Sequence, residues 1–180
     1  MTCSTTGIAT ASCTPEPPLT EETGVFRFDD RAGYQTAIGA LIAQIDRSLD
    51  IFDTDLRDTA LDSRLAVETL TRALAQSPRA EVRVVLHDAG PLQHRMPRLW
   101  TLCTAQAHRV RIRQTPRTLR HLSETFMLNG SGEAVIRTHH AHWRGKHVRA
   151  DASEIAGYAG RFAEIWEACS CCISTTKLGL

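Results

Sequence analysis

The densest group of side chains that can do chemistry is the segment His139–Arg149, which holds four of the chain's eight histidines, two arginines and one lysine. Its cations, with Trp143 as a stacking platform, can form a surface for phosphate groups or nucleic acid. On a strand, His140 and His142 would share one face, and a third histidine could join them around a metal ion. The segment can also be an exposed, partly positive strand and loop without a ligand.

A second basic run extends from Arg109 to Arg120, and in it three arginines alternate with Val110 and Ile112. This alternation is typical of a half-buried strand with one charged face. The charges can protect an edge strand from unwanted pairing. If this strand lies beside the His-rich segment, the two runs form one basic groove. The residues predicted to contact a phosphate in such a groove are Arg111, Arg113, His121, His140, His142, Arg144 and Lys146.

The net charge of +1 conceals an uneven distribution along the chain. Residues 79–150 carry 13 basic and 4 acidic side chains, a net of +9. Nearly all of these cations are arginine, which suits bidentate contact with phosphate. A GC-rich genome, which favours Arg codons over Lys codons, would produce the same bias. The charge therefore permits a phosphate ligand without requiring one.

Other groups of reactive residues are explained without a cofactor or metal. The carboxylates between Asp50 and Asp62 lack the order of a calcium loop, and helix capping and solvation account for them. His87 and Asp88 follow a predicted central strand, where ligands of α/β proteins often bind. The six cysteines do not form a disulfide framework, and the cluster Cys169–Cys172 lacks a second pair at zinc-site spacing. We expect no cofactor and no metal.

Apolar periodicity defines the elements that must position these side chains. It predicts strands over 25–28, 49–52, 82–86, 110–114, 125–128 and 134–137. Helices are expected over 31–48, 63–76, 97–107 and from 151 or 153 to 169. This order predicts an α/β sandwich with a mixed β-sheet. We expect a disordered head over 1–24, one domain over 25–169 and a flexible Cys-containing tail over 170–180. With neither a secretory signal nor a membrane span, the expected location is the cytoplasm.

Four segments, in their order and separations, carry a resemblance to a known superfamily. They are Leu49–Leu56, Val82–Asp88, Glu124–Gly130 and Phe162–Glu167. Together they resemble one half of a phospholipase D-like enzyme over roughly residues 25–169, and most of all a bacterial domain-of-unknown-function group within that superfamily. The resemblance implies a phospholipase D-like α/β sandwich with a mixed β-sheet flanked by helices.

The catalytic run of that superfamily, His-x-Lys-x4-Asp, is not preserved. Counting back from the turn at Gly130, Leu122 occupies the position of the nucleophilic His, Glu124 that of the Lys, and Asn129 that of the Asp. In the active family, two His transfer the phosphoryl group and two Lys hold its oxygens. Leu122 cannot attack phosphorus, and Glu124 would repel a phosphate. A second match to this spacing, Arg144–Asp151, has Arg at the nucleophile position, and we interpret it as coincidence.

Three functions remain as hypotheses. The first is a catalytically inactive phospholipase D-like domain that serves as a binding or interaction module for phosphate-bearing ligands or nucleic acid. The second is a divergent phosphodiesterase or nuclease that uses His121 or the segment His139–His147. The third is a structural partner domain, such as a homodimer, whose basic face has no ligand. None of the three involves a membrane.

Overall fold

The computed structural model describes residues 24–149, 151–169, 171 and 172. Most of the expected head and tail therefore lies outside the described residues. The elements are β1 Gly24–Phe28, α1 Arg31–Ala43, β2 Ser48–Asp53, α2 Arg64–Gln76, β3 Glu81–Leu86, α3 Leu92–Arg95, α4 Pro97–Ala105, β4 Val110–Gln114, the 3₁₀ turn η1 Arg117–Leu119, β5 Thr125–Asn129, β6 Glu133–Arg137, β7 Gly145–Arg149, α5 Ala152–Ala168 and β8 Cys171–Cys172.

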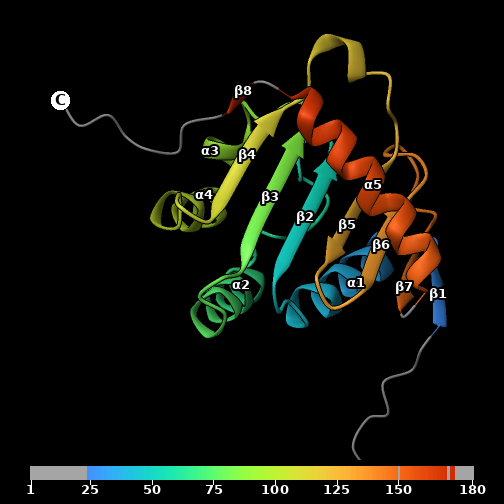
Figure 1. Ribbon diagram of the computed structural model, residues 1–180, viewed down its shortest axis with the longest axis horizontal. Coiled ribbons are helices and arrows are strands. Elements are labelled where there is room, and N and C mark those ends of the chain that lie inside the picture. Colours follow the sequence, from blue (N-terminus) through green and yellow to red (C-terminus); the bar gives the residue numbers. More distant parts are fainter. Residues whose placement is uncertain (1–23, 150, 170, 173–180) are drawn as a thin grey trace, which may run out of the picture.

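The strands form one mixed sheet in the order β1-β7-β6-β5-β2-β3-β4-β8. Strands β2, β3 and β4 are parallel, while β5, β6, β7, β1 and β8 join through antiparallel pairs. Helices α1, α2 and α4 cover one face, and α5 crosses the other (Figure 1). Two apolar clusters fill the space between sheet and helices, one on each face. The predicted α/β sandwich with a mixed sheet is confirmed.

Capping residues fix where three of the helices begin. The carboxylate of Asp30 accepts a hydrogen bond from the amide of Gly33, Ser63 Oγ accepts one from Ala66, and Asp151 accepts one from Glu154. These side chains satisfy amides that the first turn of a helix leaves unpaired. The helix expected over 31–48 is shorter than predicted and ends at Ala43.

The β5–β6 hairpin explains the early end of α1. The side-chain amide of Asn129 donates to the carbonyl of Leu41 at 3.1 Å, and Ser131 Oγ donates to the carbonyl of Gln44. These tertiary bonds satisfy carbonyls at the helix end in place of a further turn. A Cβ at Gly130 would lie 2.7 Å from Asp46 Oδ1, so only glycine allows the turn to approach this closely.

Strand β7 was not predicted, and it changes the interpretation of the His-rich segment. Gly145–Arg149 pairs with β1 on one side and β6 on the other. His140 and His142 lie in the loop before it, so the expectation that they share a strand face is wrong. Within β7, Val148 and His147 are buried, and His147 contacts Glu133 of β6 at 3.1 Å. Because His147 is polar and its partner Glu133 is distant in the sequence, apolar periodicity does not predict this strand.

Candidate functional site

Two cavities with polar linings lie at one edge of the sheet. The parallel strands β2 and β3 end there, the antiparallel β5 begins there and β6 ends there. Two adjoining cavities open among the loops of this edge, and they share Thr54 and His140. We name the first, of about 230 Å³, the Arg137 cavity, and the second, of about 340 Å³, the His121 cavity. This is the edge where ligands of open α/β sheets bind.

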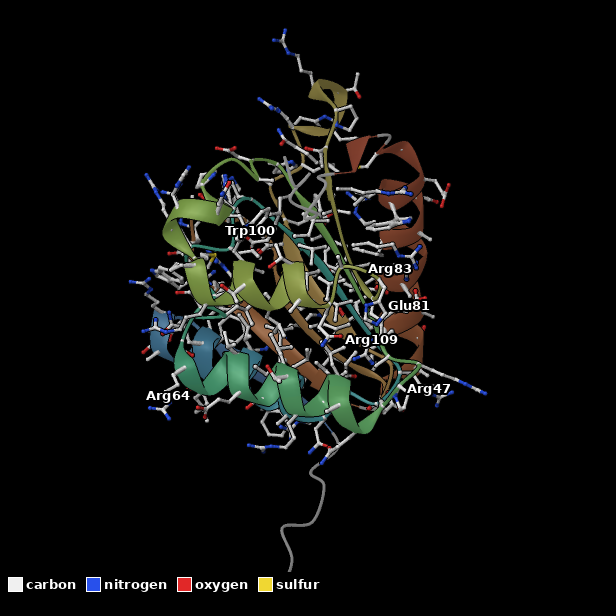
Figure 2. All side chains as sticks on the ribbon, turned by 90° about the vertical axis from the view of Figure 1, so that its left-hand side faces the viewer. Arg47, Arg64, Glu81, Arg83, Trp100 and Arg109 are labelled. Atoms are coloured by element: carbon white, nitrogen blue, oxygen red, sulfur yellow. The ribbon has the colours of Figure 1, made fainter. Side chains whose placement is uncertain are left out.

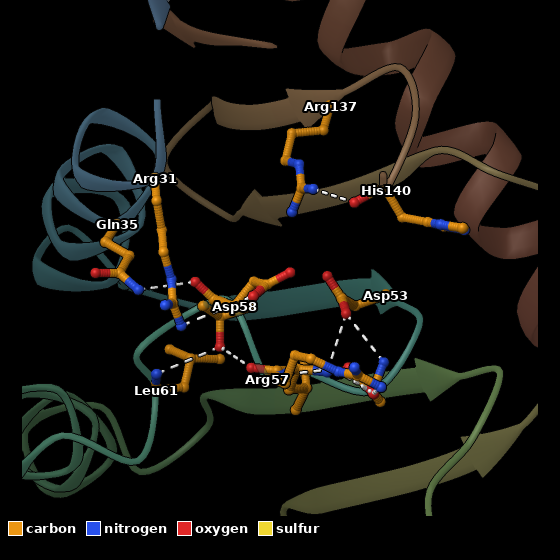
Figure 3. A network of polar contacts seen from close by, with 11 residues as sticks. Arg31, Gln35, Asp53, Arg57, Asp58, Leu61, Arg137 and His140 are labelled. Carbon is orange, nitrogen blue, oxygen red and sulfur yellow. Dashed lines mark hydrogen bonds and ion pairs between the residues drawn. The ribbon is translucent and has the colours of Figure 1, made fainter. Parts of the chain in front are cut away.

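The Arg137 cavity takes its name from a guanidinium that is almost completely buried, with 2% of the residue exposed. Its Nε donates to the carbonyl of His142 at 3.0 Å, and its Nη2 donates to the carbonyl of His140. The charged group also lies 4.6 Å from the ring centre of Tyr34 and 4.7 Å from that of Trp143. Arg137 thus fixes the loop that carries the exposed histidines (Figure 3).

Asp53 lies opposite Arg137 in the same cavity and is also buried. Its Oδ1 accepts hydrogen bonds from the amides of Asp55 and Leu56 at 3.1 and 2.9 Å. Burial raises the pKa of Asp53, because desolvation disfavours the carboxylate more than the amide bonds and Arg137 favour it. The same burial, with Asp53 nearby, raises the pKa of Tyr34.

The remaining carboxylates of the Arg137 cavity are already paired. Asp55 accepts a hydrogen bond from Arg57 Nε at 2.6 Å, and Asp58 lies 3.7 Å from the guanidinium of Arg31 (Figure 3). Among the described residues, no group of three or more His, Cys, Asp and Glu side chains has the arrangement of a metal site. The carboxylates therefore stabilise this edge rather than gather around a common centre.

The His121 cavity contains three histidines in different states. His87 donates from Nε2 to the carbonyl of Leu122 and accepts from Thr115 Oγ1 at Nδ1, both at 2.8 Å, so both of its nitrogens are occupied. His121 donates from Nδ1 to the carbonyl of Thr118, which leaves Nε2 as an acceptor toward solvent. Partial burial and neighbouring cations lower the pKa of His140.

The three positions of the lost catalytic run have structural roles. Leu122 packs against the apolar cluster under α5, and Glu124 forms an ion pair with Arg161 of that helix. Asn129 is buried, with its Oδ1 accepting from the amide of Glu133 at 2.9 Å and its amide bound to α1. Each of these side chains contributes to packing or hydrogen bonding inside the domain.

Only part of the predicted binding set meets at this edge. His121 and His140 line the same cavity, and His142 and Arg144 line a neighbouring hollow of about 670 Å³ beside Trp143. The other three predicted residues lie along the sheet and already have partners inside the domain. Arg111 pairs with Glu81, Arg113 donates to the carbonyl of Trp166, and Lys146 pairs with Glu154.

The strand portions of the two basic runs do not form one groove, although the runs meet at the His121 cavity, which Arg120 and His140 both line. Strand β4 carries Arg111 and Arg113, while Lys146 lies on β7, five inter-strand steps away in the sheet order. At about 4.8 Å per step this is roughly 24 Å. Figure 2 shows Arg83 and Glu81 turned toward α5, where the guanidinium of Arg83 forms a bidentate pair with Asp50. The arginines of β3 and β4 therefore support the packing of α5.

Sequence reasoning missed the two buried charges of the site, Asp53 and Arg137. A signal was present for Arg137, because it directly follows the apolar run Ala134–Ile136 of β6, where a strand covered on both faces would continue with an apolar residue. Arg120 was noted only as part of a basic run, yet it lines the His121 cavity. Within the described part of the chain, no helix is long and apolar enough to cross a bilayer.

Comparison with known proteins identifies the family and the fold. A family model described as a domain of unknown function, DUF7931, matches residues 30–178. No curated protein matches the sequence. Among solved structures, Nuc from Salmonella typhimurium, a phospholipase D family member, is similar with a TM-score of 0.59 and 8% identity, over 82% of this chain and 97% of that chain.

Two further structures show the same arrangement of elements. NucT from Helicobacter pylori has a TM-score of 0.56 at 8% identity, over 82% of this chain and 98% of that one. TrmBL2, an archaeal chromatin protein whose structure shows a mode of DNA binding, has a TM-score of 0.60 at 12% identity. The match covers 84% of this chain and 55% of TrmBL2. At these identities the likeness shows the fold alone.

Proposed function

Because the chain belongs to the domain-of-unknown-function family DUF7931 and has the phospholipase D-like fold, we propose that it is a binding module for a phosphate-bearing ligand, foremost single-stranded nucleic acid, and that it does not cleave this ligand. The binding surface is the loop edge of the sheet around the His121 cavity. The observation that carries the proposal is the balance of charges there.

Positive charge remains unpaired at this edge. Arg117, Arg120 and Arg144 are exposed and form no ion pair with any described residue. Of the acidic side chains nearby, Asp58 and Glu124 are paired with arginines. Asp88, which also lines the His121 cavity, is exposed and accepts a hydrogen bond from the amide of Gly90. The three arginines outnumber this carboxylate. An unpaired arginine with five donors is well suited to phosphate oxygens. DNA binding by the structural neighbour TrmBL2 is compatible with such a ligand.

The absence of cleavage rests on the residues at the reactive positions. Nucleophilic attack on phosphorus needs an imidazole with one accessible lone pair beside the phosphate. Leu122 has no such group, and Glu124 places a carboxylate where a cation would hold the phosphate. His87, the histidine under this loop, uses both ring nitrogens within the domain. His121 has a free Nε2, but it does not occupy a reactive position of the motif.

One observation favours a second candidate function, a divergent phosphodiesterase. His121 and His140 line the same cavity, and two histidines can serve as nucleophile and general acid. This candidate predicts that purified protein hydrolyses a model phosphodiester and that His121→Ala abolishes the hydrolysis. Hydrolysis that is equal in wild type and His121→Ala would point to a contaminating nuclease.

The test of binding is fluorescence anisotropy with labelled single-stranded DNA and RNA over a salt series. We expect saturable binding whose affinity falls steeply with salt, by about 0.7 in log K per log salt for each phosphate contacted. The double variant Arg117→Ala/Arg120→Ala should weaken binding and lower this slope by about 1.4. Arg79→Ala is the matched control, because Arg79 is an exposed, unpaired arginine before β3, at the opposite edge of the sheet.

Two results would contradict the proposal. One is the absence of binding at low salt. The other is a loss in log K in the Arg79→Ala control that reaches half of the loss in the double variant or more. The control removes one charge and the double variant two, so this result would indicate attraction by overall charge rather than by the loop edge.

A further inference from the structure

The Arg137 cavity holds two buried charged side chains of opposite sign that do not pair with each other. Arg137 is 2% exposed and Asp53 is 6% exposed, and both line the cavity. No ion pair joins them in the described structure, although Arg137 acts electrostatically on the Asp53 carboxyl. Buried charges are costly unless they are paired and hydrogen-bonded, so a gap between two such groups indicates a place for a bridging ligand.

The two side chains present complementary hydrogen-bonding groups to this gap. Asp53 uses Oδ1 for two backbone amides, and its Oδ2 has no hydrogen bond to a described residue. Figure 3 shows this second oxygen on the side facing Arg137. Arg137 uses Nε and Nη2 for the loop carbonyls, and its side chain also interacts with the Tyr34 hydroxyl. Its other terminal nitrogen lies on the side of the cavity that faces Asp53. One wall therefore accepts a hydrogen bond and the other donates one.

The two walls of the cavity determine which class of ligand it can bind. A phosphate would meet the repulsion of Asp53, and a cation would meet that of Arg137. A neutral, planar group with a donor and an acceptor side by side satisfies both walls at once. The Watson–Crick edge of a nucleobase is such a group, and it is accessible only when the base is unpaired.

The position of the cavity connects it to the phosphate surface. It shares Thr54 and His140 with the His121 cavity, beside Arg120. We propose, resting on the phosphate-binding function above, that the Arg137 cavity receives the Watson–Crick edge of one unpaired base, held between Asp53 and Arg137, while the adjoining phosphate lies at the His121 cavity. The module then recognises the bases of a single strand in addition to binding its phosphates.

The experiment compares three labelled ligands of equal length by fluorescence anisotropy at pH 8, which favours an ionised carboxylate. They are a single-stranded oligonucleotide of mixed sequence, the same strand made entirely of abasic residues, and the duplex. One bidentate base contact should make the base-bearing strand bind about tenfold more tightly than the abasic strand. Asp53→Asn should remove this difference, because the amide retains the acceptor for the backbone and turns a donor toward the cavity.

The outcomes separate the two proposals. Equal affinity for the base-bearing and abasic strands overturns base reading and leaves phosphate binding intact. No binding of either strand overturns both. A preference for bases that persists in Asp53→Asn, with a native circular dichroism spectrum, places the base contact elsewhere and overturns this inference. The ligand comparison on the wild-type protein is decisive even if the variant fails to fold, since a duplex that binds as tightly as the strand overturns the inference.

Discussion

The replacement Arg137→Met tests whether one buried guanidinium holds the loop edge together. The variant keeps an unbranched chain of similar length but removes the donors to the carbonyls of His140 and His142. It also removes the charge that contacts the rings of Tyr34 and Trp143. The loop would lose its fixed path, and the domain would lose stability.

The magnitude follows from opposing contributions. Two hydrogen bonds from a charged donor contribute about 3–6 kcal/mol together, and contact with two aromatic rings about 1–2 kcal/mol. Removal of the buried charge avoids its desolvation cost, and this offsets several kcal/mol of the lost stability. The exposed loop also lets water replace the lost donors at both carbonyls. We therefore expect the free energy of unfolding to fall by about 2–3 kcal/mol, a large part of the stability of an ordinary domain.

Urea denaturation followed by circular dichroism measures this loss. With a slope of about 2 kcal/mol per molar urea, the midpoint should fall by roughly 1–1.5 M. Arg144→Met is the matched control, because Arg144 lies in the same loop but is exposed and unpaired among the described residues. Amide exchange at His140, whose N–H donates to the carbonyl of Ser123 at 2.7 Å, should accelerate only in the Arg137 variant. Equal midpoints for the two variants would refute the reasoning.

Three further predictions concern backbone packing and pH. Gly145→Ala should destabilise the domain by about 1–3 kcal/mol, because the new Cβ would lie 2.5 Å from the Phe28 ring. Gly157→Ala has open space around the new Cβ and should stabilise α5 by about 0.5–1 kcal/mol. Thermal unfolding measures both changes. Burial lowers the pKa of His147. The stability that its neutral form contributes is complete above pH 6.5 and is lost as the pH falls through the lowered pKa. His147→Gln should therefore reduce this loss of stability in a pH series of melting temperatures. Burial raises the pKa of Asp53. The stability that its neutral form contributes is complete below pH 3.8 and is lost as the pH rises through the raised pKa. Asp53→Asn should therefore be more stable than wild type at pH 8, and an equal advantage at pH 4 would contradict this assignment.

Most of the fold was predictable, because local patterns and tertiary packing agree in its central part. The apolar run Val82–Leu86 forms the parallel strand β3, and Asn129–Gly130 begins the turn between β5 and β6. Pro97 marks the first turn of α4, as expected from its missing amide. Cys103 is a buried apolar residue as predicted, and burial raises the pKa of its thiol to about 12.

What could not be predicted depends on partners far away in the sequence. Strand β7 contains one buried aliphatic residue, Val148, and its pairing requires β1 and β6 on either side. Arg137 can be buried only because Tyr34 and the loop carbonyls surround it. Arg111 and Lys146 looked equivalent as cations, but the sheet order separates them and gives each an acidic partner. Sequence patterns report periodicity, whereas such sites depend on which strands become neighbours.

The pairing of β1 with β7 has a consequence for how the chain folds. Val25 lies opposite Val148, so the first strand of the sheet finds its partner only after more than a hundred residues have been made. Long-range pairing of this kind is slow, because loop closure precedes any gain from contacts. During synthesis, β1 must wait unpaired with Val25 and Phe26 exposed, and these side chains stay 44% and 40% exposed even in the finished domain. Docking of β1 is therefore a late step of folding, and the unpaired β1 is most vulnerable to aggregation before β7 has emerged from the ribosome.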